Sequence, residues 1–219
     1  MVFFTRRFLP VVGTSIGNID EGTIITLNEN ASPVEFYVAK QDYESGLNGA
    51  GRTLLVRKAG YQTMTWARET VTAWASSSLL SWLKGTYKNI LDADIQEAIS
   101  TTTYYFTQGY AGINGSWNVL TRSDGIFQLS LTELGMSDDR ANVEGSPLPI
   151  ASILQVAYIN GEKAIQWTRS PVVGDARRIW ALSTTPGAFA LLGYKSSGVS
   201  RPAFTLPATF KLSDSQIIS

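Results

Sequence analysis

The sequence predicts an α+β domain, in which two amphipathic helices pack on short, mostly antiparallel strands joined by long loops. Apolar residues recur with helical spacing only between residues 71 and 99, whereas short segments with the character of strands lie on both sides. Helices and strands grouped in separate stretches of a chain are typical of this class. The 219 residues contain no repeat with a period of about 20–50 residues, so one hydrophobic core is the simplest organisation.

The first 20 residues are apolar and basic but follow the period of neither a helix nor a strand. Their apolar residues include Phe3, Phe4, Phe8, Val11 and Val12. We predict that residues 1–20 form an arm that docks on a neighbouring molecule, and that residues 21–219 form a single domain. The alternatives for residues 1–20 are an extended segment packed on its own domain and a disordered terminus.

The segments that follow are predicted to be strands. Residues 23–27 are β-branched and apolar, and residues 33–38 carry apolar side chains at every second position, so we expect these two segments to pair. A glycine-rich turn at residues 45–51 then leads into a third short strand at residues 53–57.

Two helices are predicted next. The apolar face of the first would carry Val71, Trp74, Ser78, Leu79, Trp82 and Leu83, spaced as one side of an α-helix. Gly85 is expected to end this helix. The second helix is expected at residues 92–99, with Asp92 as its N-cap.

Beyond residue 100 the helical period does not return, and the remaining elements are predicted to be strands. They are expected at residues 102–107, 126–131, 153–158, 163–168, 178–183, 189–194 and 204–212. Long polar loops at residues 109–118 and 136–148 separate some of them. Loops on a rigid sheet are where binding residues are usually found.

The chain contains no histidine and no cysteine, which excludes whole classes of active site. Zinc sites built from these residues, thiolate nucleophiles and Ser-His-Asp relays all require one of them. We therefore predict a protein that is not an enzyme, with no catalytic residue, metal or cofactor.

The charge balance and the hydropathy of the sequence limit the classes of partner that we expect. The 18 Lys and Arg residues balance the 18 Asp and Glu residues, so no net field favours nucleic acid. No apolar run reaches the roughly 18 residues of a membrane span, and residues 8–12 are fewer than the about 7–15 of a signal-peptide core, so we expect neither membrane insertion nor secretion. Only 16% of residues are charged, which favours a surface used for contacts with other proteins.

Five segments, taken in order, carry a family resemblance. They are Ser-Leu-Leu-Ser-Trp-Leu-Lys-Gly at 78–85, Ala-Ile at 98–99, Gly-Ile-Phe-Gln-Leu-Ser at 125–130, Gln-Trp-Thr-Arg-Ser-Pro at 166–171 and Ser-Arg-Pro-Ala-Phe at 200–204. Together they resemble a bacterial and phage domain family of unknown function, over about residues 9–212. The resemblance implies a C-type-lectin-like fold, similar to formylglycine-generating enzymes and to lectin-like receptor-binding proteins of some phages. It also implies a place among the structural genes of phages that infect gut bacteria.

The sequence departs from these relatives at their functional residues. Formylglycine generation relies on cysteines, which this chain lacks, and calcium-dependent sugar binding relies on Glu-Pro-Asn and Trp-Asn-Asp motifs, whereas Trp117-Asn118 is followed here by Val119. Both activities are therefore unsupported. Arg169 and Arg201 lie beside aromatic residues or proline, which favours a structural role for both guanidinium groups, with ligand contact as the alternative.

Two further sequence patterns are compatible with a catalytic or an ion-binding site. Ser81 and Lys84 match the Ser-x-x-Lys spacing of penicillin-recognising enzymes, but a lysine late in a helix is more simply explained by the helix dipole. Residues 137–144 hold Asp138, Asp139 and Glu144 and could bind Ca²⁺ if the loop folds back on itself. The spacing matches no EF-hand, so a solvated loop is favoured, and the ion remains open.

Aromatic residues near glycine-rich loops are the best candidates for ligand binding. The ligand-binding residues that we predict are Tyr110, Trp117, Phe189 and Tyr194. Aromatic faces with few charges nearby suit stacking on a sugar or contact with a protein.

We therefore predict a non-enzymatic bacteriophage virion protein with a lectin-like domain, synthesised in the cytoplasm of the host. It would recognise the host surface from a tail fibre or tail tip, or decorate the capsid. Its expected partners are other virion proteins, further copies of itself and a host-surface glycan or protein. The alternatives are a carboxylate-dependent cell-wall or carbohydrate-active enzyme and a free bacterial lectin-like binding module.

Overall fold

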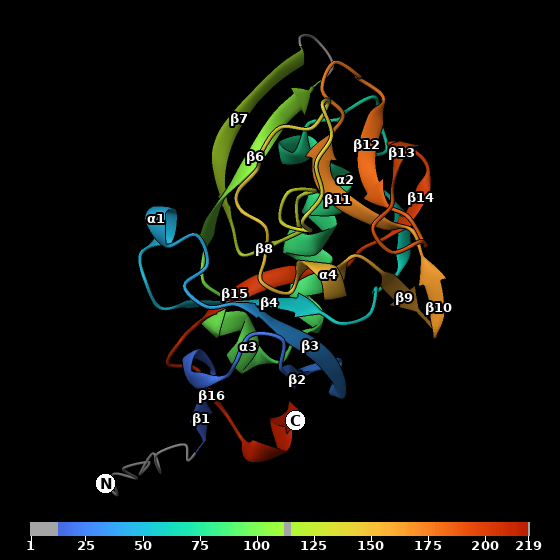
Figure 1. Ribbon diagram of the computed structural model, residues 1–219. Coiled ribbons are helices and arrows are strands. Elements are labelled where there is room, and N and C mark those ends of the chain that lie inside the picture. The colour runs from blue at the N-terminus through green and yellow to red at the C-terminus, as the bar shows by residue number, and fades with distance from the viewer. Residues whose placement is uncertain (1–12, 112–114, 219) are drawn as a thin grey trace, which may run out of the picture.

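The structure, a computed structural model that describes residues 13–111 and 115–218, is predominantly β. Strands make up 41% of it and helices 18% (Figure 1). The predicted α+β, C-type-lectin-like class with two amphipathic helices is therefore wrong. The described helices are short, and α1 (Ser45–Asn48) lies at the periphery with no buried residue (Figure 1), so the sheets supply most of the layers that bury the core.

The larger sheet has six strands, and adjacent strands in it are all antiparallel. Their spatial order is β17 (Ile217–Ile218), β2 (Ile24–Glu29), β3 (Ser32–Lys40), β4 (Arg52–Arg57), β15 (Ala203–Pro207) and β8 (Ile126–Phe127). The predicted pairing of β2 with β3 is confirmed, with Ile24 opposite Tyr37. Asn30 and Ala31 join these strands at φ 49° and 60°, the positive values that a two-residue hairpin turn of type I′ requires.

The second sheet has five strands, built mostly from the C-terminal third of the chain. Their order is β13 (Phe189–Gly193), β12 (Arg178–Leu182), β11 (Gln166–Pro171), β14 (Ser197–Val199) and β5 (Thr63–Thr65). The pair β11–β14 is parallel, and the others are antiparallel. Pro171 is the last residue of β11, consistent with the confinement of proline to strand ends and edges.

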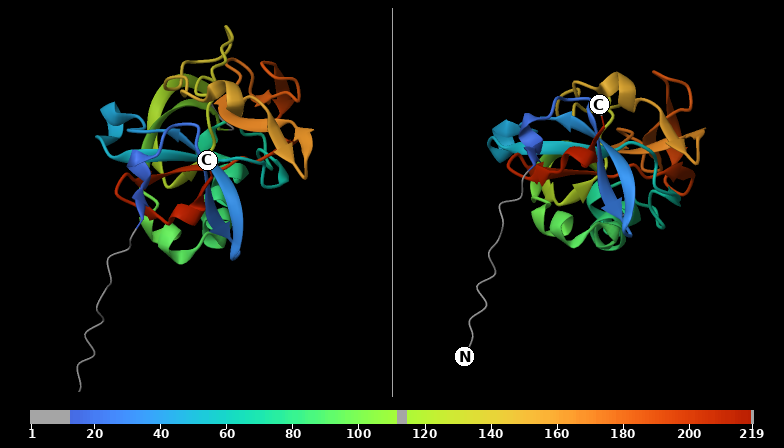
Figure 2. Two further views of the ribbon diagram at one scale, coloured as in Figure 1. Left: turned by 60° about the horizontal axis from the view of Figure 1, so that its bottom comes forward. Right: turned by 90° about the horizontal axis from the view of Figure 1, so that it is seen from below.

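The strands β6 (Thr102–Tyr110) and β7 (Gly115–Asp124) form a long hairpin that rises beside the five-stranded sheet at the upper left of Figure 1. Two smaller pairs complete the sheets: β9 (Ala157–Ile159) with β10 (Glu162–Ala164), and β1 (Thr14–Ser15) with β16 (Lys211–Leu212). Figure 2 shows the first and last described parts of the chain lying together, as the pairs β1–β16 and β17–β2 require.

Most of the predicted arm lies outside the described residues, since the structure describes none of residues 1–12. Within the rest of it, β1 pairs with β16, and the 3₁₀ turn η1 (Ile16–Asn18) follows. Ile16 is fully buried, and its backbone N–H donates to the carbonyl of Phe210 over 2.9 Å. Residues 14–18 are thus packed on their own domain.

The helical periodicity at residues 71–85 does not produce one helix. The chain forms a 3₁₀ turn η2 (Trp74–Ser76), the α-helix α2 (Ser78–Trp82), a π-turn η3 (Leu83–Tyr87) and a 3₁₀ turn η4 (Lys88–Ile90). Ser77 separates η2 from α2, because its hydroxyl caps α2 by accepting a hydrogen bond from the Leu80 N–H. Gly85 lies inside η3 rather than at the end of a helix, so the apolar spacing predicted burial correctly but not a continuous helix.

The remaining helices are equally short: α1 (Ser45–Asn48), α3 (Ala93–Ala98), α4 (Ala151–Leu154) and the 3₁₀ turn η5 (Asp214–Gln216). Asp92 does precede α3 as predicted, but its carboxylate accepts from Asn28 instead of capping the helix. Residues 153–158, predicted as a strand, are divided between α4 and β9. Among the described residues, no helix is long and apolar enough to cross a membrane.

Tryptophans dominate the core between the sheets. Trp66, Trp74, Trp167 and Trp180 are each at most 1% exposed. Their indole N–H groups are hydrogen-bonded, as buried ones must be: that of Trp66 donates to the Thr168 carbonyl over 2.9 Å, and that of Trp74 donates to the Tyr104 hydroxyl over 2.8 Å. These bonds fix the segment that follows Trp66 against β6 and β11.

Candidate functional site

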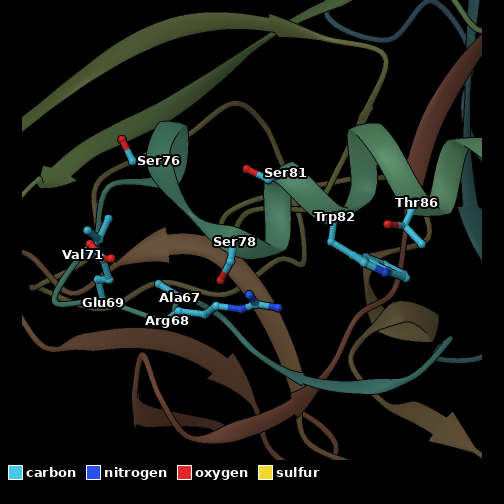
Figure 3. Close-up of a pocket in the computed structure, with 9 residues that line it drawn as sticks. All are labelled: Ala67, Arg68, Glu69, Val71, Ser76, Ser78, Ser81, Trp82 and Thr86. Atoms are coloured by element: carbon cyan, nitrogen blue, oxygen red, sulfur yellow. The ribbon is translucent and has the colours of Figure 1, made fainter.

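A solvent-open hollow of about 490 Å³ lies between residues 67–71 and the irregular helical segment η2–α2–η3 (Figure 3). Four hydroxyl side chains line its helical wall: Ser76, Ser78, Ser81 and Thr86. Arg68 and Glu69 contribute opposite charges from the facing loop. The hollow thus presents many hydrogen-bonding groups and little net charge.

The local sequence explains why the two walls face one another. Trp66 is anchored in the core, and its carbonyl accepts a hydrogen bond from the Leu79 N–H over 3.1 Å. The Ser78 hydroxyl donates weakly to the same carbonyl, over 3.4 Å. The loop after Trp66 is therefore fixed to the start of α2, so the hollow is part of the fold.

Trp82 supplies the apolar surface of the hollow. Its ring is partly exposed and packs on Tyr61 and Tyr87, with ring centroids 5.4 and 5.6 Å away. Tyr87 is fully buried, and its hydroxyl donates to Glu29, which pairs with Arg57 over 2.9 Å. Trp82, which the sequence placed on the apolar face of a helix, is therefore also an aromatic platform supported by two tyrosines.

Arg68 is the exposed positive charge of the site. Figure 3 shows its side chain extending from the loop past Ser78 in the direction of Trp82. The residue is exposed, as is the neighbouring Glu69. A guanidinium group with free donors beside an aromatic face suits recognition of a polar ligand.

Two of the predicted ligand-binding residues hold the loop of the hollow without lining it. The Tyr194 carbonyl accepts from the backbone N–H groups of Trp66 and Ala67, each over 3.1 Å. The Tyr110 carbonyl accepts in the same way from Thr72 over 2.8 Å and from Ala73 over 3.1 Å. Tyr110 and Tyr194 thus fix the two ends of the wall at residues 67–71.

The other two predicted ligand-binding residues lie away from the hollow. Trp117 is in β7 and partly exposed, and its carbonyl accepts from the Asn142 amide. Phe189 begins β13 and packs edge-on against Trp180, with ring centroids 4.9 Å apart. The structure therefore does not gather the four predicted residues into one site.

The Ser-x-x-Lys spacing does not form a catalytic pair. Lys84 pairs with the buried carboxylate of Asp124 over 2.8 Å, and the Ser81 hydroxyl donates to the Ser77 carbonyl over 3.2 Å. Arg122 also pairs with Asp124, over 2.6 Å. Lys84 is thus engaged with β7, while Ser81 faces the hollow.

The acidic residues at 137–144 are likewise separated. Asp138 accepts from the Arg140 N–H over 2.9 Å, whereas Glu144 is fully buried and accepts from the Thr107 N–H over 2.6 Å and from the Ser170 hydroxyl. In residues 13–111 and 115–218, no three His, Cys, Asp or Glu side chains are grouped so as to hold a metal ion. Asp138, Asp139 and Glu144 are therefore not grouped so as to hold Ca²⁺ in the described structure.

Arg169 is the centre of a buried ion network. It is 0% exposed, and its guanidinium group donates to Glu133 over 2.7 Å and to the carbonyls of Tyr105 and Gln128 over 2.9 Å. Burial lowers the pKa of Arg169, but attraction to Glu133, and further to Tyr43 and Glu144, outweighs it and raises the pKa. This arginine is a structural link between β11, β6 and the loop that carries Glu133.

Arg201 is buried as deeply but in different surroundings. It is 1% exposed and donates to the backbone carbonyls of Arg57 over 2.8 Å, Leu154 over 2.9 Å and Val156 over 3.3 Å, and to the Gln166 amide oxygen over 3.3 Å. No carboxylate of the described residues pairs with it. The structural role predicted for both arginines is thus seen in their hydrogen bonds, but only Arg169 has its charge balanced.

Sequence reasoning missed the hollow because Trp82 and its neighbours were assigned to helix packing. The signal in the sequence was the concentration of serine and threonine around Trp82, at positions 76–78, 81 and 86, although Ser78 was assigned to the apolar face. Arg68 and Glu69 gave no local signal, since charged loop residues are common.

Fold and hollow together define a predominantly β domain with a polar and aromatic surface site. The chain belongs to the family described as Domain of unknown function (DUF6273), whose model matches residues 50–208. The expected membership of an uncharacterised domain family is confirmed, over a shorter range than residues 9–212. No curated protein and no solved structure matches the chain.

Proposed function

We propose that this protein is a non-enzymatic component of a bacteriophage particle that binds a host-surface glycan in the hollow beside Trp82. The observation that carries the proposal is the composition of the hollow. An aromatic ring supported by Tyr61 and Tyr87 lies next to a row of hydroxyl groups, with Arg68 and Glu69 opposite. Sugars stack on aromatic faces and exchange hydrogen bonds with hydroxyl and charged side chains, so these groups match a polyhydroxylated ligand.

The buried ionisable groups support a binding role in place of catalysis. Glu133 and Glu144 are engaged with Arg169 and Ser170, Glu29 with Arg57 and Tyr87, and Asp124 with Lys84 and Arg122; these six partners belong to the scaffold. Carboxylates held in this way act as acceptors inside the fold. The groups that remain accessible at the hollow are hydroxyl, aromatic and charged side chains suited to binding a ligand.

The phage assignment rests on the ordered segments between residues 78 and 204 that resemble a family frequent among phage structural genes. Immunogold electron microscopy of particles from a producing culture tests it. Label at the tail tip supports recognition of the host, and label over the head supports decoration of the capsid. The absence of label on particles that contain the protein's gene would overturn the virion assignment.

Glycan binding is tested with purified protein on an array of bacterial surface polysaccharides. Arg68→Ala should weaken binding about tenfold, the loss of one or two charge-assisted hydrogen bonds. The matched control Arg178→Ala replaces an arginine that is 53% exposed on β12 and pairs with Asp175 outside the hollow. Equal binding by the two variants would overturn the assignment of the hollow.

A further inference from the structure

A second cavity, of about 220 Å³, lies over Arg201 and shares no lining residue with the hollow beside Trp82. One wall is formed by Glu35 and Tyr37 in the middle of β3 and by the segment after β4, and the other by residues of α4, β9 and the segment between them. The apolar side of the cavity consists of Ala59, Ile153, Val156 and the ring of Tyr158. Ile153 and Tyr158 are 49% and 44% exposed, unusually high for large apolar side chains, and they form its rim.

The charge at this cavity is positive and lies at its base. Two cations, Arg201 and Lys58, and one anion, Glu35, line it. Lys58 and Glu35 pair with each other over 2.9 Å and are partly exposed, with 35% and 44% of their side chains accessible. Their charges cancel, so the charge that remains is that of buried Arg201.

The guanidinium group of Arg201 retains donor capacity on the cavity side. Its Nε and Nη1 atoms make the hydrogen bonds to the carbonyls and to Gln166, whereas no acceptor among the described residues is bonded to Nη2. Nη2 of Arg169 is also without a bonded acceptor and is fully buried, but Glu133 lies against that guanidinium group over 2.7 Å and balances its charge, as no carboxylate of the described residues does for Arg201. A buried cation that is neither paired nor exposed is costly, and an anion supplied from outside removes that cost.

We propose that this cavity binds a small organic anion, with one carboxylate on Nη2 of Arg201 and an apolar body against Ile153, Val156 and Tyr158. The apolar wall selects against inorganic anions, which would lose their hydration there. The cavity is smaller than the about 300–1,000 Å³ typical of sites for drug-sized ligands, which limits the ligand to a single ring or a short branched chain. Burial lowers the pKa of Arg201 to about 10, so the group still carries its charge at neutral pH.

Benzoate is the probe, and benzyl alcohol is its uncharged counterpart of nearly equal size. Both are titrated into the full chain at constant ionic strength while two-dimensional ¹H–¹⁵N spectra are recorded. Benzoate should cause saturable shifts at the backbone signals of Lys58, Ala59, Ile153 and Tyr158, and benzyl alcohol should bind at least about tenfold more weakly. Equal affinity for the two probes, or shifts elsewhere in place of these, would overturn the proposal.

A pair of aspartate variants tests the location without altering the buried arginine. Ile153→Asp places a negative charge at the rim, and Val143→Asp places the same charge at a residue that is 73% exposed in another loop. The rim variant should lose benzoate affinity by about tenfold or more through repulsion, and the control should keep it. Both variants should unfold at similar temperatures without ligand, and identical benzoate affinities would contradict the site.

Discussion

Two regions of the molecule bury an arginine to the same extent and use it differently. Around Arg169, the ion pair with Glu133 balances the charge, with Glu144 and Tyr43 close by, and ring centroids of Tyr104 and Phe127 lie 4.7 and 5.9 Å from the guanidinium carbon. Around Arg201, the acceptors are backbone carbonyls and one amide. Carbonyls satisfy donors but do not neutralise a charge, so only the second region retains a reason to bind an anion.

The largest expected effect separates the two arginines directly. Arg169→Met leaves Glu133 and Glu144 as buried carboxylates without a cation, and should lower the free energy of unfolding by about 3–5 kcal/mol. Arg201→Met leaves no buried carboxylate without a partner and only removes hydrogen-bond donors from carbonyl groups. The free energy of unfolding should therefore fall by about 1–3 kcal/mol. Urea unfolding of both variants measures the two losses in free energy of unfolding. A larger loss for Arg201→Met than for Arg169→Met would contradict the difference drawn between the two arginines.

A smaller effect is expected when the partner of Arg169 is neutralised. Glu133→Gln keeps an acceptor but removes the charge, and should cost about 1.5–3 kcal/mol, the range for hydrogen bonds to charged groups. The control Glu35→Gln breaks the partly exposed pair with Lys58 and should cost about 0–1 kcal/mol. Denaturant midpoints at pH 7 compare the two, and equal losses would show that the Glu133–Arg169 pair contributes no more than a surface pair.

The smallest effect is a pH dependence that arises at Glu44, close to Glu133 and Arg169. Partial burial, with a further contribution from Glu133, raises the pKa of Glu44, so the folded state binds a proton at higher pH than the unfolded state does. Stability contributed by this group therefore increases as pH falls from neutral through the raised pKa, and decreases as pH rises through it.

Glu44→Gln should remove this dependence. The free energy of unfolding of the wild type, minus that of the variant, should increase between pH 8 and pH 5. Chemical unfolding at several pH values measures the difference. A difference that stays constant or changes in the opposite direction would contradict the assigned cause.

Much of the strand content, but not the fold class, could be predicted from the sequence. Alternating apolar residues at 33–38 identified β3, and the strand expected at residues 163–168 overlaps β10 and β11. The apolar stripe at 71–83 identified buried residues such as Trp74 and Leu79. The stripe could not show that the Ser77 cap and the turn at η3 would divide the helix, because burial and hydrogen bonding to Trp66 override local propensity.

The candidate sites were less predictable than the strands. Tyr110 and Tyr194 lie next to the hollow because their backbone carbonyls anchor residues 67–71, a contact that depends on tertiary structure and not on side-chain type. Arg169 and Arg201 occur in similar aromatic and proline-rich contexts, so composition could not distinguish them. Their difference arises from residues far away in the chain, namely Glu133 beside one and the carbonyls of Arg57 and Leu154 beside the other.

The most direct test of this difference observes both guanidinium groups in one experiment. Each Nε–H is buried and donates to a backbone carbonyl, that of Arg169 to Tyr105 over 2.9 Å and that of Arg201 to Arg57 over 2.8 Å, so both signals should be protected in a ¹H–¹⁵N spectrum. On addition of benzoate, we expect a saturable shift of the Arg201 signal and no shift of the Arg169 signal. An unmoved Arg201 signal, or equal movement of both, would contradict it.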